Sequence, residues 1–140
     1  MFASSHPSRG ALNPMRLDLY QQVGVETRLS SATPHHMVAM LFEGFIDSVS
    51  QARGAIRSGR HDLKGLAIGR AVRIVEEGLR AGLDLQAGGA LARDLHDLYG
   101  YLTLRLTMAN LHSDEQALEE CSRLMQPLQD AWLSISDKTR

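Results

Sequence analysis

SSATPHHMVAMLFEGFI, residues 30–46, joins a polar lead of Ser, Thr, Pro and His to a run that is almost entirely apolar. Thr33 has the side chain of a helix N-cap, and Pro34 suits the first helical position, where its missing N–H costs nothing. A helix of a soluble protein needs only one apolar stripe, yet three apolar residues follow one another from Met40. Such a helix is either buried on most sides or carries apolar surface for a partner.

The helix that begins here is expected to run to about Ser58, with Gly59 as its stop. Two further helices are expected over residues 62–85 and 90–111, separated by a pair of glycines. Leu, Ala, Glu and Arg are plentiful in this chain, and alternating β-branched runs are missing, so the composition favours helices over strands.

A fourth helix is expected from Ser113, because Ser113 and Gln116 match a capping box. In all four helices apolar residues recur at alternating steps of three and four, which is the spacing of one helical face. The predicted seams are Val38, Phe42, Phe45, Val49, Ala52 and Ile56; Ile68, Val72, Val75 and Leu79; Leu91, Leu95, Leu98 and Leu102; and Ala117, Cys121, Leu124, Leu128, Ala131 and Ile135.

Four helices of similar length with short connections pack as antiparallel neighbours. The sequence therefore predicts an all-α fold, an antiparallel up-and-down four-helix bundle, with a short N-terminal helix over residues 15–27. The Ser/Pro/Gly-rich residues 1–14 are expected to be a disordered tail, residues 15–136 a single domain, and residues 137–140 a disordered end.

The bulk composition narrows the class of partner. Lys and Arg number 15 against 16 Asp and Glu, which argues against a protein that holds nucleic acid by its phosphates. A single Cys excludes an internal disulfide framework and fits the cytoplasm. The first residues lack the apolar core of a signal peptide, and no apolar run is long enough to span a membrane. We expect a cytoplasmic protein without direct membrane insertion.

Residue types that carry chemistry are present but scattered. His35 and His36 point about 100° apart on a helix, so they cannot share a metal ion, and both are expected to be exposed. No Glu is followed three residues later by His, as a di-iron bundle requires. Cys121 falls in a seam and is expected to be a core residue. We therefore expect that the protein is not an enzyme and that it binds no metal and no cofactor.

Surplus apolar surface is the feature that remains. The third helix has a second stripe, and the first helix has apolar residues off its main seam: Tyr101, Leu104, Met108 and Leu111; and Met37, Met40 and Leu41. They form either a wide core face or a groove for an amphipathic segment, with Met supplying adaptable contacts. The pairs Gly65/Gly69 and Gly78/Gly82 leave the same two alternatives open, close packing or a groove.

From Tyr20 to about Ile135 the chain resembles the FliS family, the flagellin-specific export chaperones of bacterial flagella. The segments that carry the resemblance, in order, are Tyr20-Gln-Gln-Val23, Thr33-Pro34-His35, Met40-Leu41-Phe42-Glu43-Gly44, Gln51-Ala52-Arg53, Lys64-Gly65, Gly78-Leu79-Arg80-Ala81-Gly82-Leu83-Asp84, Gly88-Gly89, Asp97-Leu98-Tyr99-Gly100-Tyr101, Arg105-Leu106, Ala109-Asn110-Leu111 and Ala131-Trp132.

The resemblance implies a cytoplasmic chaperone that binds the C-terminal region of flagellin, prevents its premature polymerisation and delivers it to the flagellar type III export gate. The candidate flagellin-binding residues are Tyr20, Val23, Met40, Leu41, Leu98, Tyr99, Tyr101, Leu102, Arg105, Met108 and Asn110. The alternative is a structural or regulatory homodimer whose extra apolar surface packs against its own copy.

Several residues depart from the usual pattern: the family usually has Asp in place of Glu43, and Leu104 and Thr107 lie in a block that is usually more basic. Gly100 stands where the family usually has Asp. Pro127 lies inside the fourth helix, where it cannot donate to the Arg123 carbonyl and should kink the helix. We also expect residues 15–27 to cover part of the groove in the free protein, because so short a helix needs a surface to dock on.

Overall fold

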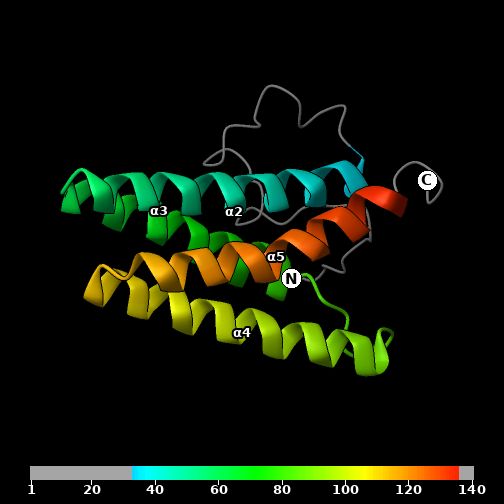
Figure 1. Ribbon diagram of the computed structural model, residues 1–140. Coiled ribbons are helices and arrows are strands. Elements are labelled where there is room, and N and C mark those ends of the chain that lie inside the picture. Colours follow the sequence, from blue (N-terminus) through cyan, green and yellow to red (C-terminus); the bar gives the residue numbers. More distant parts are fainter. Residues whose placement is uncertain (1–32, 136–140) are drawn as a thin grey trace, which may run out of the picture.

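The computed structural model describes residues 33–135, and the expected helix over 15–27 and both expected tails lie outside them. The described chain forms α2 (Pro34–Arg57), α3 (His61–Arg73), η3 (Ile74–Arg80), α4 (Gly89–His112) and α5 (Glu115–Ile135). Figure 1 shows α3 and η3 as one rod, and shows the chain reversing direction at each connection between the rods. The expected all-α bundle is confirmed.

The first helix begins as its sequence predicts. The Thr33 hydroxyl accepts a hydrogen bond from the His36 backbone N–H at 3.0 Å, and Pro34 occupies the first turn. At the other end Gly59 adopts a φ of +71°, in the left-handed region that favours glycine after a helix. These local signals place both ends of α2 within a residue or two of the prediction.

Helix α2 is buried on most of its sides. It packs against α3, η3 and α5, so only a narrow strip of it faces solvent. Met40 and Leu41 are 3% and 1% exposed and belong to the core, as Phe42 does. The expectation that Met40 and Leu41 line a surface groove is therefore wrong, because three neighbouring elements need a wider apolar face than one seam.

The second rod is shorter than predicted and ends in a π-helix. The Ala81 N–H donates to the Glu76 carbonyl, five residues back, which is the π-helical pattern. The wider turn buries neighbouring pairs of residues, among them Gly78 and Leu79. The helix ends at Arg80 and not at residue 85, because the Asp84 carboxylate accepts hydrogen bonds from two following backbone N–H groups and forms a turn.

Side chains of η3 reach across to α4. The Thr103 hydroxyl donates to Glu76 at 2.6 Å, and Glu76 also pairs with Arg80 at 2.9 Å. A Cβ added at Gly100 would lie 2.9 Å from the Arg80 guanidinium. Gly100 therefore leaves room for this guanidinium. This contact explains why a residue without a side chain suits the position where the family usually has Asp.

The predicted capping box of the fourth helix is wrong. Ser113 adopts the left-handed conformation, with φ of 49°, and ends α4. Asp114 caps α5 instead, since its carboxylate accepts from the backbone N–H groups of Gln116 and Ala117. The Ser113 hydroxyl is occupied elsewhere, because it accepts a hydrogen bond from the Lys64 ammonium at 2.8 Å.

The predicted seams hold near the middle of the bundle and fail at one end. Leu102 and Cys121 are fully buried, as expected. Leu91, by contrast, is 68% exposed, and Ala131 and Ile135 are exposed as well. All three lie at the end of the bundle where α4 begins and α5 finishes. There the helices diverge and leave the seam residues uncovered (Figure 1).

Candidate functional site

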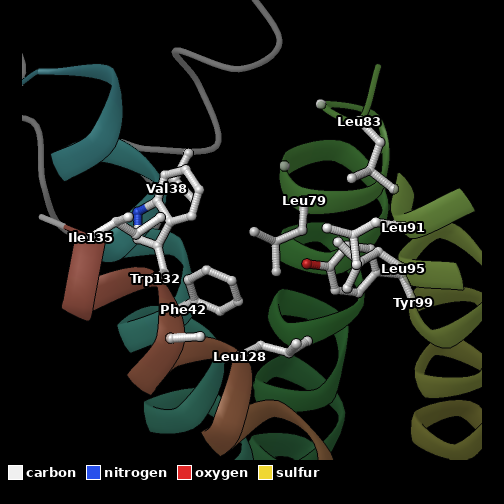
Figure 2. A pocket seen from close by; sticks show the side chains of 13 residues that line it. Val38, Phe42, Leu79, Leu83, Leu91, Leu95, Tyr99, Leu128, Trp132 and Ile135 are labelled. Carbon is white, nitrogen blue, oxygen red and sulfur yellow. The ribbon is translucent and has the colours of Figure 1, made fainter. Parts of the chain in front are cut away.

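An apolar cavity of about 420 Å³ opens at this diverging end of the bundle. Figure 2 shows two facing walls, one from α2 and α5 and the other from η3, the connection after it and α4. None of the lining side chains is charged. We call this cavity the end pocket, and its lining residues are Val38, Phe42, Gly78, Leu79, Gly82, Leu83, Leu91, Leu95, Tyr99, Leu128, Ala131, Trp132 and Ile135.

The wall from α2 and α5 is held by a pair of aromatic rings. The His35 imidazole stacks on the Trp132 indole, with ring centroids 4.7 Å apart and planes 9° from parallel. The Trp132 indole N–H donates to the His35 carbonyl at 2.9 Å, and His35 Nε2 donates to the Trp132 carbonyl at 2.9 Å. The expectation that His35 is a solvated surface residue is therefore wrong, whereas His36 is exposed as expected.

The wall from η3 and α4 carries one hydroxyl among apolar side chains. Tyr99 is buried, and Figure 2 shows its oxygen pointing into the end pocket. Burial raises the pKa of the Tyr99 phenol to about 12, so the hydroxyl keeps its proton at neutral pH. A buried tyrosine hydroxyl usually has a hydrogen-bond partner. Tyr99 thus offers a polar contact inside an otherwise apolar site.

Glycines shape the second wall. Gly78 and Gly82 both line the end pocket, which places this pair in a groove. A Cβ added at Gly65 or Gly69 would meet nothing within 4 Å, so this other pair allows no close packing within the described chain. Of the two alternatives, the position of Gly78 and Gly82 in the lining of the end pocket favours a groove.

The second stripe of the third predicted helix faces solvent. Its members are exposed side chains along α4, which we call the outer α4 stripe: Tyr101, Leu104, Met108 and Leu111. At its edge the Tyr101 hydroxyl and Arg105 Nε each donate to Glu120 of α5 at 2.7 Å. The hydrogen bond from Tyr101, and then that from Arg105, lowers the pKa of the Glu120 carboxyl. These contacts hold one edge of the stripe against α5.

The predicted flagellin-binding residues fall into separate groups. Met40, Leu41 and Leu102 are core residues, and Leu98 packs half-buried against the core. Tyr99 lines the end pocket, and Tyr101 and Met108 lie on the outer α4 stripe with Arg105 beside them. The Asn110 side chain is exposed, and its carbonyl accepts from Lys64. Tyr20 and Val23 lie outside the described residues.

Sequence reasoning missed most of the end pocket. The apolar spacing places Leu79, Leu95 and Leu128 in seams, and it gives Trp132 no role beyond the resemblance. The available signal was the Gly78/Gly82 pair together with the single Trp of the chain. A glycine pair and a tryptophan do not predict that the helices diverge, and this divergence is what creates the pocket.

Two other kinds of site are missing from the part of the chain that the structure describes. Residues 33–135 contain no grouping of three or more His, Cys, Asp or Glu side chains suited to a metal ion. Among the same residues, no helix combines the length and apolar character that a membrane crossing needs. Cys121 is buried as expected, and burial raises the pKa of its thiol to about 12.

The described chain is an all-α bundle with an uncharged pocket at one end and an apolar stripe along one helix, which are surfaces of the kind that apolar protein segments occupy. The family model for flagellar protein FliS matches residues 16–139. This chain belongs to the FliS family, which is a family of flagellar secretion chaperones and not of enzymes.

Curated relatives agree over most of their length. The chain is 42% identical over 119 residues to the flagellar secretion chaperone FliS of Salmonella typhimurium, covering 85% of this chain and 88% of that protein. It is 40% identical over 117 residues to the flagellar secretion chaperone FliSB of Pseudomonas aeruginosa, covering 84% and 92%. Against the flagellar secretion chaperone FliS of Escherichia coli the identity is 37%, over 81% of this chain and 83% of that protein.

Proposed function

We propose that this chain is a cytoplasmic export chaperone that binds the C-terminal region of flagellin, prevents its premature polymerisation and delivers it to the flagellar export gate. The single observation that carries the proposal is the end pocket, a cavity of about 420 Å³ lined by uncharged side chains. The names of the relatives supply the cargo class, since they are flagellar secretion chaperones.

The end pocket suits one face of an amphipathic helix. Apolar residues at helical spacing can enter between the two walls, where Leu79 and Leu95 face Phe42 and Leu128 (Figure 2). Each leucine-sized side chain that leaves water contributes about 1.5–3 kcal/mol to binding before the costs of ordering the segment. Several such side chains are needed, because a disordered segment loses conformational freedom when it folds on a partner.

The outer α4 stripe extends the apolar surface beyond the pocket. Leu104 and Leu111 are among the exposed large apolar side chains of the described chain. A longer segment of flagellin that fills the end pocket with one helix can cover this stripe with another. Covering the apolar faces through which flagellin polymerises would keep the cargo monomeric until export.

Calorimetric titration with intact flagellin, and with flagellin that lacks its C-terminal segment, tests this proposal. We expect binding only to the intact protein, with a negative heat-capacity change because apolar surface is buried. Equal affinity for both forms would overturn the assignment. Light scattering of the free chain tests the alternative: a stable homodimer that ignores flagellin would favour a regulatory or structural role for the outer α4 stripe.

A further inference from the structure

The last two turns of α5 supply all of the side chains that α5 contributes to the end pocket. Pro127 lies inside α5 and has no N–H to donate to the Arg123 carbonyl. The helix nevertheless continues to Ile135, and Figure 1 shows its second half bending away from α4 toward α2. The pocket residues that α5 contributes all follow this proline: Leu128, Ala131, Trp132 and Ile135. The position of this short segment therefore sets the width of the end pocket.

The polar ties that cross from this segment to another helix are few. In the described chain, the two hydrogen bonds between Trp132 and His35 are the ones that link residues 128–135 to a different element. The Ser134 hydroxyl donates to a carbonyl of its own helix, and the Gln126 amide likewise bonds within α5. The stacked His35 ring covers one face of the indole at the same time.

The partner of His35 fixes the role of its Nε2 atom. A carbonyl oxygen only accepts, so His35 Nε2 must carry a proton to bond the Trp132 carbonyl at 2.9 Å. Nε2 carries that proton in the imidazolium and in one neutral tautomer. Both of these forms of the ring can therefore make the hydrogen bond.

We propose that His35 is a positioning residue, which holds Trp132 and the segment beyond Pro127 as one wall of the end pocket. Without the His35 ring, residues 128–135 move relative to the rest of α5, because the backbone hydrogen bond is missing at Pro127. The distance between the two walls of the end pocket is then no longer fixed. The identity of the ligand rests on the proposed function, whereas the tie between the two helices does not.

The experiment uses the full chain, in which Trp132 is the single tryptophan and gives a single indole N–H signal in NMR spectra. His35→Ala is compared with His36→Ala, a matched control in the same helical turn whose exposed ring lies outside this contact. Indole exchange and the backbone exchange of residues 128–135 report the wall. Backbone exchange at Ala117 and Cys121 reports the rest of α5, and a flagellin C-terminal peptide reports binding.

His35→Ala should accelerate indole exchange and weaken peptide binding by about tenfold each, while Ala117 and Cys121 exchange as before. His36→Ala should change none of these. His35→Phe keeps the stacked ring but not the Nε2 bond, and should restore part of both losses. This partial rescue also guards against a His35→Ala variant that folds poorly.

Unchanged indole exchange in His35→Ala would overturn the tie. Faster exchange with unchanged peptide affinity would overturn the positioning role, since the tie would then be structural only. A uniform loss of protection throughout α5 would also contradict a local wall. If the unmodified chain does not bind the peptide, the proposed function fails, and the exchange measurements still test the tie.

Discussion

The two ends of the bundle differ in the kind of side chain that joins or separates the helices. Where α2 meets α3 and α4 meets α5, charged side chains bridge the helices: Glu115 of α5 pairs with Arg53 and Arg57 of α2, and Lys64 of α3 donates to the Asn110 carbonyl and to Ser113. At the opposite end, the end pocket is lined by uncharged side chains and its α5 wall is tied to α2 through His35. Charged side chains bridge the helices at one end, and an uncharged cavity lies open at the other.

Chain connectivity explains the contrast. At the charged end the helices are joined by very short connections, between Arg57 and His61 and between His112 and Glu115, so helix termini and their caps crowd together. Lys64 satisfies one of the last carbonyls of α4, where a positive charge is favourable. At the pocket end a longer connection, residues 81–88, separates η3 from α4 and allows the helices to diverge.

The largest effect should come from placing a charge in the end pocket. Leu91 lines the pocket and is 68% exposed, so Leu91→Glu is compatible with folding. A carboxylate there must lose water when the cargo helix docks, and flagellin affinity should fall about 100-fold, or about 2.7 kcal/mol, in calorimetric titration.

Leu66→Glu is the matched control for Leu91→Glu. Leu66 is 71% exposed and lies on α3, outside the end pocket. Its substitution should leave flagellin affinity unchanged. If the two variants weaken binding equally, the cargo does not distinguish the two regions, and the contrast between the ends has no bearing on binding.

Lys64→Met tests the charged end. Lys64 is 8% exposed, and the variant keeps an apolar chain of similar length but removes both hydrogen bonds of the ammonium. Because hydrogen bonds to charged groups contribute about 1.5–3 kcal/mol, we expect the free energy of unfolding in urea to fall by about 2 kcal/mol. Flagellin affinity should barely change; a larger loss of affinity than of stability would contradict the division of roles.

Pro127→Ala probes the bend of α5. Alanine restores a backbone donor and removes the ring clash, a gain of up to about 3 kcal/mol if the helix straightens. Because the His35–Trp132 contact holds the bent segment, we expect a rise in the free energy of unfolding of only about 1 kcal/mol, measured by thermal unfolding.

The same substitution in a His35→Ala background should stabilise the chain more than it does alone, because the segment beyond residue 127 is then free to straighten. Strictly additive effects would show that bend and tie are independent. A lower melting temperature for Pro127→Ala alone would show that the proline is required for the packing of α5.

Tyr99→Phe tests whether the cargo forms a hydrogen bond with the Tyr99 hydroxyl. The ring stays in place, so folding should be unaffected, but the hydroxyl that points into the pocket is lost (Figure 2). One neutral hydrogen bond contributes about 1 kcal/mol, so flagellin affinity should fall about fivefold. Unchanged affinity would show that the cargo makes only apolar contacts with this wall.

The smallest effect should be the acid sensitivity of the half-buried ion pairs of Glu115 and Glu120. Hydrogen bonding from Arg57 lowers the pKa of Glu115, and hydrogen bonding from Tyr101 lowers that of Glu120, both from an ordinary value of 4.5. A carboxylate whose pKa is depressed by folding stabilises the native state above its ordinary pKa, and this contribution is lost as the pH falls through the lowered value.

Urea unfolding at a series of pH values below 4.5 measures this loss, which should be small because solvent still reaches both half-buried carboxylates. A Glu115→Gln, Glu120→Gln double variant should lose less stability in acid than the unmodified chain. An equal loss in both would place the acid sensitivity elsewhere in the molecule.

Local chemistry in the sequence determined much of this protein. Thr33 and Pro34 start α2, Gly59 ends it, and the spacing of apolar residues predicts four helical rods. The outer α4 stripe was also visible from spacing, since it lies opposite the buried face of the same helix. All of these depend on residues within one or two turns of each other, where helical geometry alone fixes their relation.

Tertiary structure determined what each face meets. Met40 and Leu41 are buried because α2 has three neighbours, and Leu91 is exposed because the helices diverge where α4 begins. The Trp132–His35 contact joins residues 97 positions apart in the chain. Burial, the end pocket and this contact depend on which elements lie beside each other, and the period of a single helix carries no information about its neighbours.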